Sequence, residues 1–249
     1  MDPELYREMA AIQQEHWWFR ARREILARVI ARLALPSKAA VLEIGAGTGG
    51  NLRMLSQHGV VSAVEMDPFA RQHASEVSGL DVSSGCLPDQ VPFADGSFDL
   101  ICLFDVLEHV EDDTKALGRV RELLKPGGRA LITVPAYAWL YGVHDRAHHH
   151  FRRYTARQLR LKARNAGLRV CRSGYFNALL FPLIATHRLQ STVLGAEESH
   201  DATLPNGFVN KLLYCVFGAE KYLVPVTLFP WGTSVLAVLQ HDRSIASHD

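Results

Sequence analysis

Hydrophobic and polar positions follow two different patterns along the chain. In the first 36 residues, apolar side chains recur at helical spacing in two runs, which predicts two helices. The positions are Leu5, Met9 and Ile12, then Ile25, Leu26, Val29, Ile30 and Leu33. From residue 38 onward, short apolar runs alternate with further helical patterns. This alternation is typical of a parallel sheet with helices on both faces.

Seven apolar runs have the length and composition of strands. They lie near residues 41–44, 60–64, 80–84, 98–104, 129–134, 168–174 and 234–239. We expect the last run to pair with the sixth as a hairpin, so the sequence predicts an α/β fold with a doubly wound, seven-stranded, mostly parallel sheet. We expect one domain over residues 1–249. Its parts are a helical lid at 1–36, an α/β core at 38–175 and 232–241, and an apolar helical insertion at 176–231.

A glycine-rich turn follows the first expected strand. Four of the six residues at positions 45–50 are glycine, and a helical pattern begins directly afterwards. Glycines allow a sharp turn and let a ligand approach where a Cβ atom would collide. A strand, a glycine turn and a helix in this order predict the first ligand-binding turn of a doubly wound sheet.

Two cofactors fit this turn. Gly45-x-Gly47-x-x-Gly50 matches the dinucleotide fingerprint. Glu43, however, would repel a pyrophosphate, whereas it would attract the ammonium group of an amino acid. This charge argument favours S-adenosylmethionine, which is cationic at its sulfur and its amine. Glu65 lies about 20 residues further on, where an acid accepts hydrogen bonds from ribose hydroxyls in either kind of site; the alternative for Glu65 is a solvated acid before a turn.

These residues and two later motifs carry a family resemblance. The turn matches E-x-G-x-G-x-G, the run at 98–109 matches F-D-x5-D-x-L-E-H, and residues 124–128 read L-K-P-G-G. In these features the chain resembles the class I S-adenosylmethionine-dependent methyltransferases. The resemblance implies a Rossmann-like fold, S-adenosylmethionine as cofactor, and a fourth strand whose carboxyl end, from Phe104 to His109, faces the methyl group.

The resemblance also implies the rest of the cofactor site. Residues 17–22 are similar to a W-W-F-x-x-R segment that forms a lid over the cofactor, in which Arg22 suits the methionine carboxylate. The alternative is a helix corner whose aromatic rings pack on the core. Family members often place an acid for adenine where Ser84 or Gly85 stands here. The expected cofactor-binding residues are Trp18, Arg22, Glu43, Gly45, Ala46, Gly47, Gly49, Glu65, Met66, Cys86, Leu87 and Phe104.

The segment 143–154 has three possible interpretations. His144 and His148, four residues apart, could bind a metal on one helical face. The segment could also be a solvated loop without a task. We favour an active-site role, because it resembles the H-D-x4-H-x-R-R-Y segment of a subset of these methyltransferases; the matching residues are His144, Asp145, His150, Arg152, Arg153 and Tyr154. We expect no metal.

Four residues are the catalytic candidates. His150 would act as the base if the acceptor is a hydroxyl, and Asp145 would orient its ring. His109 and His144 are the alternative bases. In the other interpretation, His150 only pins the loop through a hydrogen bond.

Composition narrows the classes of protein that fit. The chain has 249 residues, 48% of them hydrophobic, and a net charge of +1, which suits one α/β core and gives no reason to expect nucleic-acid binding. Four widely spaced cysteines, a start without a secretory signal and the lack of a spanning apolar run favour a reduced, cytoplasmic setting. A stripe of Arg153, Arg157, Arg160 and Arg164, near the insertion in sequence, indicates a peripheral membrane contact or, alternatively, a solvated face.

The sequence therefore predicts methyl transfer from S-adenosylmethionine to a small, lipophilic acceptor, with a hydroxyl favoured. One alternative is a protein that binds this cofactor without methyl transfer, as a scaffold or a cyclase-like catalyst. Another is a nicotinamide-dependent oxidoreductase, which Glu43 and the turn at residues 125–128 disfavour.

Overall fold

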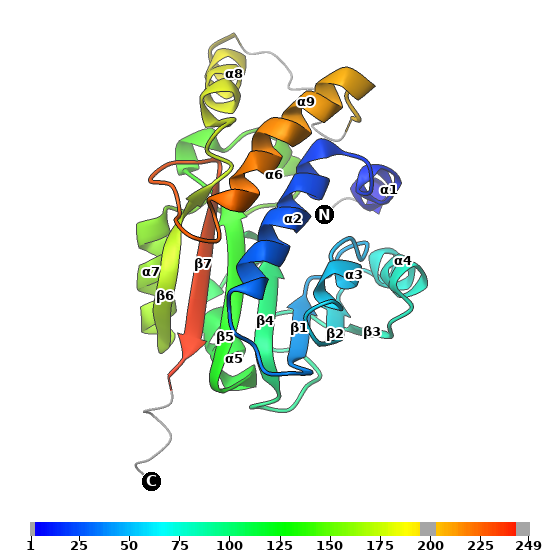
Figure 1. Cartoon of the computed structure of the whole chain (residues 1–249), viewed down its shortest axis with the longest axis vertical. Coiled ribbons are helices and arrows are strands. Elements are labelled where there is room, and N and C mark those ends of the chain that lie inside the picture. Colours follow the sequence, from blue (N-terminus) through cyan, green and yellow to red (C-terminus); the bar gives the residue numbers. More distant parts are fainter. Residues whose placement is uncertain (1–2, 195–202, 243–249) are drawn as a thin grey trace.

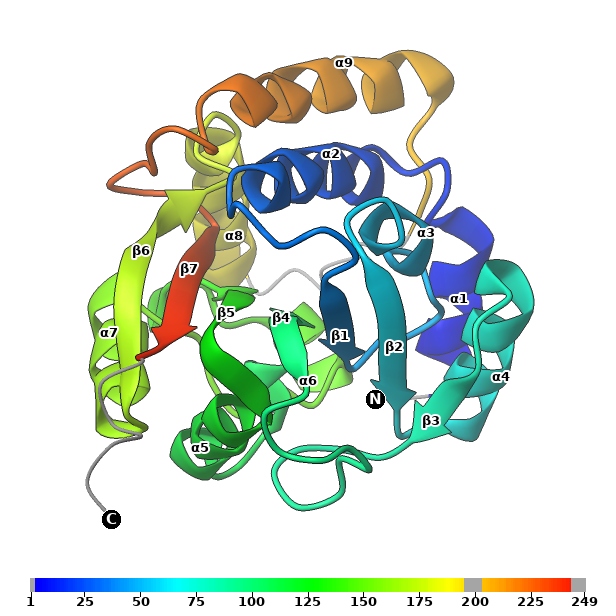
Figure 2. The same cartoon turned by 60° about the horizontal axis from the view of Figure 1, so that its bottom comes forward.

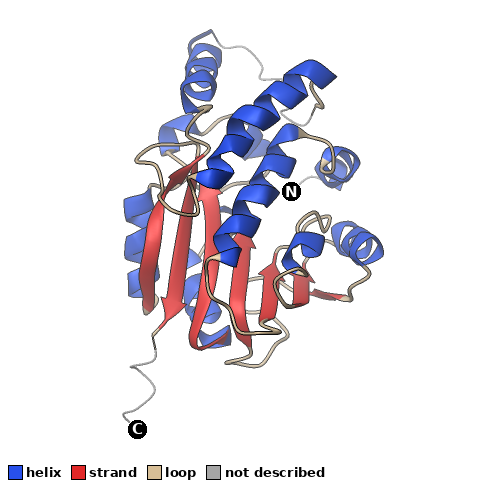
Figure 3. Cartoon of the chain, viewed as in Figure 1, coloured by secondary structure: helices blue, strands red, loops and turns tan. Residues whose placement is uncertain are grey.

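The structure is a computed structural model that describes residues 3–194 and 203–242. Over these residues, seven strands form one sheet in the order β3-β2-β1-β4-β5-β7-β6 (Figure 1; Figure 3). The strands are β1 (Ala40–Ile44), β2 (Val60–Glu65), β3 (Val82–Ser84), β4 (Phe98–Phe104), β5 (Leu124–Pro135), β6 (Leu168–Phe176) and β7 (Ser234–His241). Only β7 runs antiparallel to its neighbours, β5 and β6. The predicted fold class is confirmed, although β5, β6 and β7 are longer than expected.

Helices cover both faces of the sheet. Figure 2 shows α2 and α9 stacked on one face and α5 on the other. The helices are α1 (Pro3–Ile12), α2 (Trp17–Ala31), α3 (Leu52–Leu55), α4 (Pro68–Ser78), α5 (Asp113–Leu123), α6 (Val143–Ala147), α7 (Ala156–Asn165), α8 (Phe181–Leu194) and α9 (Gly207–Gly218). The described residues also form the short 3₁₀ turns η1 (Leu107–His109), η2 (Ala138–Leu140) and η3 (Ala219–Tyr222).

The central strand β4 shows why the two faces have separate cores. Its side chains alternate between the faces, as expected for a strand. Leu100, Cys102 and Phe104 pack with α2, whereas Ile101 and Leu103 pack with α5 and α7. Because both faces are covered, the strand is a nearly continuous apolar run. The sheet therefore positions the carboxyl ends of β1 and β4 next to each other.

The insertion is attached to the helix α2 and to the end of β6. The backbone N–H of Trp17 donates to the Asn210 side chain at 2.8 Å, and the Trp17 and Phe217 rings lie 6.0 Å apart. The buried Glu220 carboxylate accepts N–H bonds from residues 177, 178 and 179 at 2.7 to 2.9 Å. The insertion is thus held at both ends. Within the insertion the sequence also predicts an exposed loop at 197–205, of which residues 197–202 lie outside the described residues.

Two expectations about the surface are also addressed by the structure. Among residues 3–194 and 203–242, no helix combines the length and the apolar character needed to cross a bilayer. The arginine stripe is shorter than expected, because Arg153 precedes α7 and its side chain is buried against Asp145. Figure 1 places α7 along β6, while α8 and α9 lie above the carboxyl ends of the strands.

Candidate active site

The glycine turn lies at the carboxyl end of β1. Backbone N–H groups of Gly45 and Ala46 both donate to the Val64 carbonyl, at 2.8 and 3.0 Å, which pulls the turn onto β2. A Cβ on Gly45 would lie 2.6 Å from Val106, and one on Gly49 would lie 2.8 Å from Ala74. A Cβ on Gly47 would meet no atom within 4 Å. Gly45 and Gly49 therefore satisfy internal packing, while the space at Gly47 is open to a ligand.

An acidic and a basic residue, Glu43 and Arg22, lie beside this turn. Glu43 is buried, with Oε1 accepting from Asn51 at 2.8 Å and Oε2 without a hydrogen-bond partner among the described residues. Burial raises the pKa of Glu43 to about 8, and the nearby Arg22 opposes this shift. Arg22 binds Asp105 at 2.8 Å and the Thr133 hydroxyl at 2.6 Å, and its Nε has no partner within the described chain.

The unpartnered atoms of these two residues fit the methionine part of the cofactor. A carboxylate oxygen suits the ammonium group, and a guanidinium N–H suits the carboxylate. The rings of Trp18 and Phe104 flank the Arg22 guanidinium at 4.7 and 5.6 Å. The structure thus brings four of the predicted cofactor residues together: Trp18, Arg22, Glu43 and Phe104.

Glu65 is not a solvated acid, because only 4% of its surface is exposed. Its Oε2 accepts from the Gly47 N–H at 2.7 Å and its Oε1 from the Asp67 N–H at 2.9 Å, while burial raises its pKa. Each carboxylate oxygen can accept a second hydrogen bond. Glu65 can therefore bind ribose hydroxyls while it holds the glycine turn in shape.

The remaining predicted cofactor residues differ in exposure. Met66, at the end of β2, is exposed, whereas Leu87 packs in the core. Cys86 is half-buried, and its thiol lies 3.7 Å from the Gln90 side-chain oxygen. Among these, Met66 and Cys86 have the freer surfaces for adenine.

Two residues of the first helix region were not predicted from the sequence. Gln13 accepts from the Thr48 hydroxyl at 2.9 Å and holds α1 against the glycine turn. The pKa of Tyr6 is raised by burial and, to a smaller extent, by the charges of Glu65 and Asp67. A lone Gln and a lone Tyr in an amphipathic helix carry no sequence signal for this site.

The predicted catalytic residues come together beyond the carboxyl end of β4. Asp145 is fully buried and accepts from the Gly142 N–H, His150 Nδ1 and two Arg153 nitrogens, at 2.7 to 2.8 Å. These partners hold the pKa of Asp145 well below its usual range. The His109 ring, from η1, lies 4.6 Å from the His150 ring, and the His144 ring lies 6.1 Å away. Asp145 therefore orients His150 in the way that the sequence predicts.

Four histidines around this point, His109, His144, His148 and His150, form a half-buried cluster, which we call the histidine cluster. Burial lowers the pKa of His109 to about 3, of His148 to about 3 and of His144 to about 4, and the neighbouring rings contribute to the first two shifts. At neutral pH these three imidazoles are therefore uncharged.

The R-R-Y part of the segment also has a structural task. Arg152, Tyr154 and Lys162 converge on a second buried carboxylate, Asp113, at 2.7 to 2.9 Å. Arg153 instead binds Asp145, so consecutive residues anchor the segment to two different carboxylates. The interpretation of this segment as a solvated loop without a task is therefore wrong. The sequence did not single out Asp113, because its partners are about 40 residues or more away.

Glu108 is a further residue that sequence reasoning did not single out. It is fully buried in η1, and neither carboxylate oxygen has a hydrogen-bond partner among the described residues. Burial, followed by the charge of Asp105, raises its pKa. The only signal in the sequence was its place in the L-E-H motif.

A seven-stranded sheet with an acidic residue and a glycine turn at the end of β1 is typical of methyltransferases, which bind a nucleoside cofactor. A family model described as a methyltransferase domain matches residues 18–173, so the chain belongs to this family of S-adenosylmethionine-dependent methyltransferases. The nicotinamide-dependent oxidoreductase alternative is wrong.

Two curated relatives each match less than half of the chain. The dimethylglycine N-methyltransferase of Parasynechococcus marenigrum is 36% identical over 116 residues, which cover 42% of this chain and 40% of that protein. The ubiquinone biosynthesis O-methyltransferase of Xanthomonas campestris is 34% identical over 111 residues, covering 42% and 46%. The matched part thus spans less than half the length of either relative.

Solved structures share the fold over most of the chain. A sarcosine dimethylglycine methyltransferase homologue from Galdieria sulphuraria superposes with a TM-score of 0.61 at 18% identity, covering 89% of this chain and 86% of that one. A phosphoethanolamine N-methyltransferase from Haemonchus contortus, in complex with S-adenosylmethionine, has a TM-score of 0.56 at 18% identity, covering 88% and 52%.

Proposed function

We propose that this methyltransferase acts on a hydroxyl group of a small, lipophilic acceptor. The observation that carries the proposal is the His150–Asp145 pair, which lies beside His109 just past the end of β4. A hydroxyl needs to lose its proton as it attacks, whereas an amine can lose it afterwards. A histidine that a carboxylate holds in one orientation is therefore useful mainly to a hydroxyl acceptor.

The proposed reaction is an in-line displacement at the methyl carbon. The acceptor oxygen forms the new C–O bond while the bond to sulfur breaks, and the sulfonium leaves as the neutral thioether of S-adenosylhomocysteine. The hydroxyl proton passes to His150 Nε2, and Asp145 stabilises the resulting imidazolium. Most of the rate comes from holding both reactants at attack distance in a site that excludes water.

The experiment compares three acceptors with labelled S-adenosylmethionine: a phenol with a long alkyl chain, the same phenol without the chain, and an alkylamine of equal length. We expect the alkylphenol to accept the label fastest. Methylation of the amine with none of the phenol would contradict the hydroxyl, and equal rates for both phenols would contradict the lipophilic part. Tight S-adenosylhomocysteine binding without transfer to any acceptor, including a lipid extract of the host, would favour the cofactor-binding alternative.

A lipophilic acceptor also suits the apolar insertion, which we propose walls the acceptor pocket and contacts an anionic membrane surface. Large apolar side chains are exposed on the insertion, among them Leu183 on α8, and Phe208 and Leu212 on α9. Apolar side chains beside cations are typical of proteins that lie on such a surface.

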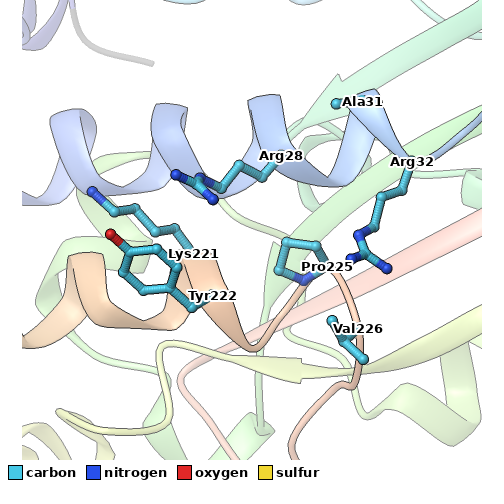
Figure 4. A pocket seen from close by; sticks show the side chains of 7 residues that line it. All are labelled: Arg28, Ala31, Arg32, Lys221, Tyr222, Pro225 and Val226. Atoms are coloured by element: carbon cyan, nitrogen blue, oxygen red, sulfur yellow. The ribbon is translucent and has the colours of Figure 1, made fainter.

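Cations from α2 and from η3, which is part of the insertion, line one pocket, whereas α7 contributes none of its lining. This pocket has a volume of about 390 Å³, and Figure 4 shows the side chains of Arg28, Arg32 and Lys221 lining it. Tyr222 and Val226 line the same pocket and are each 62% exposed. This combination of basic and apolar side chains suits a lipid phosphate with its chains beside it.

Sedimentation with phosphatidylserine vesicles at low salt tests the membrane proposal. Replacing Arg28 and Arg32 with serine should weaken binding on the order of 30-fold, since each cation contributes roughly 1 kcal/mol at such a surface. Lys221 is left in place because it is paired with Glu24 at 2.7 Å. The matched control replaces Arg157 and Arg164 on α7 with serine and should bind like the parent. If the parent does not sediment, the insertion only walls the acceptor pocket.

A further inference from the structure

We propose that Glu108, His109 and His150 form a binding site for a divalent transition-metal ion, with Zn²⁺ as the representative ion. One ligand atom from each of the three residues can be chosen so that all three lie within 4.8 Å of one another. Glu108 and His109 come from η1, and His150 comes from the turn after α6, some 40 residues later. The site differs from the His144 and His148 pair that helical spacing suggested.

Glu108 provides the strongest argument, because a buried carboxylate normally has a hydrogen-bond or charged partner. It is 0% exposed, and both of its oxygens lack a partner in the described chain. Its charged neighbours do not supply one. Asp105 has the same charge, Arg22 is bound to Asp105 and Thr133, and Arg153 is bound to Asp145. A metal cation would fill this place.

His150 is arranged as metal-binding histidines usually are. Such a histidine donates one ring N–H to a carboxylate or carbonyl, which turns its other nitrogen toward the metal. His150 Nδ1 lies 2.8 Å from the ionised Asp145, which can only accept, so Nε2 is the ring nitrogen that remains for a metal. Asp145 is itself held by Arg153 and by the Gly142 N–H. The orienting group is therefore rigid before a metal arrives.

The donor set indicates the class of ion. Two imidazole nitrogens and one carboxylate suit Zn²⁺, Fe²⁺, Co²⁺ or Mn²⁺ better than Ca²⁺, and in catalytic zinc sites three such ligands leave one position open. Ligand atoms bound at about 2.1 Å lie about 3.4 Å apart on a tetrahedron, so closing this site needs shifts of about 1 Å. His109 is uncharged at neutral pH, as a ligand must be.

This site does not depend on the proposed acceptor. It would replace our expectation that the chain holds no metal. While an ion is bound, His150 Nε2 is coordinated, so its role as a base belongs to the metal-free protein. In the metal-bound protein, the open position could take the acceptor oxygen, and the ion would then lower the pKa of the hydroxyl.

The experiment titrates the chelator-treated protein with Zn²⁺ by calorimetry, and with Co²⁺, whose visible absorption reports its ligand set. We expect one ion per chain. Glu108→Gln and His109→Ala should each weaken Zn²⁺ binding at least 100-fold and change the Co²⁺ spectrum. Asp145→Asn should weaken it about 10- to 100-fold, as substitutions of orienting groups do. His144→Ala and His148→Ala are the matched controls and should bind Zn²⁺ like the parent.

S-adenosylhomocysteine affinity and melting temperature, measured for every variant, show whether it is folded. The proposal is overturned if the folded parent binds no ion, if folded Glu108→Gln binds Zn²⁺ as tightly as the parent, or if the His144 and His148 variants lose binding while Glu108→Gln retains it. None of these readouts uses an acceptor, so the outcome is separate from that of the acceptor experiment.

Discussion

The cofactor half of the site, around the glycine turn, and the acceptor half, around His150, differ in where their residues come from. Most of the cofactor half lies between Glu43 and Asp67, where backbone N–H groups donate to the Val64 carbonyl and to the Glu65 carboxylate. The acceptor half collects side chains from η1, α5, the α6–α7 segment and α8. Local backbone thus shapes one half, and distant side-chain pairs shape the other.

This difference predicts how each half responds to substitution. Around the glycine turn, several polar atoms are left open toward the ligand, such as Glu43 Oε2 and Arg22 Nε. Around Asp145, the polar atoms largely satisfy one another. We therefore expect substitutions in the cofactor half to affect ligand affinity first, and substitutions around Asp145 to affect stability or turnover first.

The largest expected effect is on turnover, in the acceptor half. His150→Ala removes the proposed proton acceptor and should slow methyl transfer to a hydroxyl acceptor by about 10²- to 10⁴-fold. The affinity for S-adenosylhomocysteine should stay within about threefold of the parent, because His150 lies outside the cofactor half. Steady-state kinetics with the true acceptor, together with calorimetry, measure both quantities. A variant that turns over like the parent removes His150 from the mechanism, and one that loses affinity and melting temperature together reassigns it to structure.

The next effect is on stability. Asp145→Ala leaves Arg153 and His150 buried without their shared partner, which should lower the free energy of unfolding by about 3–5 kcal/mol. Urea denaturation measures this change. Arg157→Ala, on the exposed side of α7, is the control and should lie within about 0.5 kcal/mol of the parent. A loss below 1 kcal/mol for Asp145→Ala would mean that the acceptor half is not held together by this carboxylate.

A smaller effect is expected in the cofactor half. Glu65→Ala removes the acceptor of the Gly47 and Asp67 N–H groups, and by our assignment that of the ribose hydroxyls. S-adenosylhomocysteine binding should weaken by about 1–3 kcal/mol, the usual range when buried polar groups lose a partner. Calorimetry decides the matter. Unchanged affinity would restrict Glu65 to supporting the turn.

The smallest effect concerns pH and Glu43. The folded, ligand-free protein holds the pKa of Glu43 at about 8, so this carboxyl is mostly protonated at pH 7 and must lose its proton to bind the cofactor ammonium. Asn51 and Arg22 favour the charged form, and burial and Glu65 oppose it. S-adenosylhomocysteine affinity should therefore fall by about fivefold when the pH is lowered from 8 to 7, since the charged fraction of a carboxyl with a pKa of about 8 falls from one half to about one eleventh over this range.

The same raised pKa has a consequence for stability. Between the unfolded value, about 4.5, and the folded value, about 8, the folded protein binds more protons at Glu43 than the unfolded chain does. Its contribution to stability is therefore complete below pH 4.5 and is lost as the pH rises through 8. Glu43→Gln replaces this carboxyl with an amide, which does not titrate. The variant should show a flatter dependence of melting temperature on pH, and a flatter dependence of affinity on pH, than the parent; parallel curves would contradict the assignment.

The sequence by itself determined the sheet, its order of elements and the class of cofactor. Apolar runs and glycine turns act locally, because a buried strand needs continuous apolar residues and a sharp turn needs residues without a Cβ atom. The charge of Glu43 then separated S-adenosylmethionine from a dinucleotide. None of these features needs a contact between distant parts of the chain.

Only the tertiary structure decided which side chains meet. It removed Arg153 from the basic stripe by pairing it with Asp145, added Asp113 as the second anchor of the R-R-Y residues, and placed cations from α2 beside the insertion. It also showed that Glu108 is buried without a partner next to two histidines. These contacts join residues that are 8 to nearly 200 positions apart in the sequence. Sequence spacing alone specifies a contact only within one helix or strand, because only there is the repeat of the backbone known.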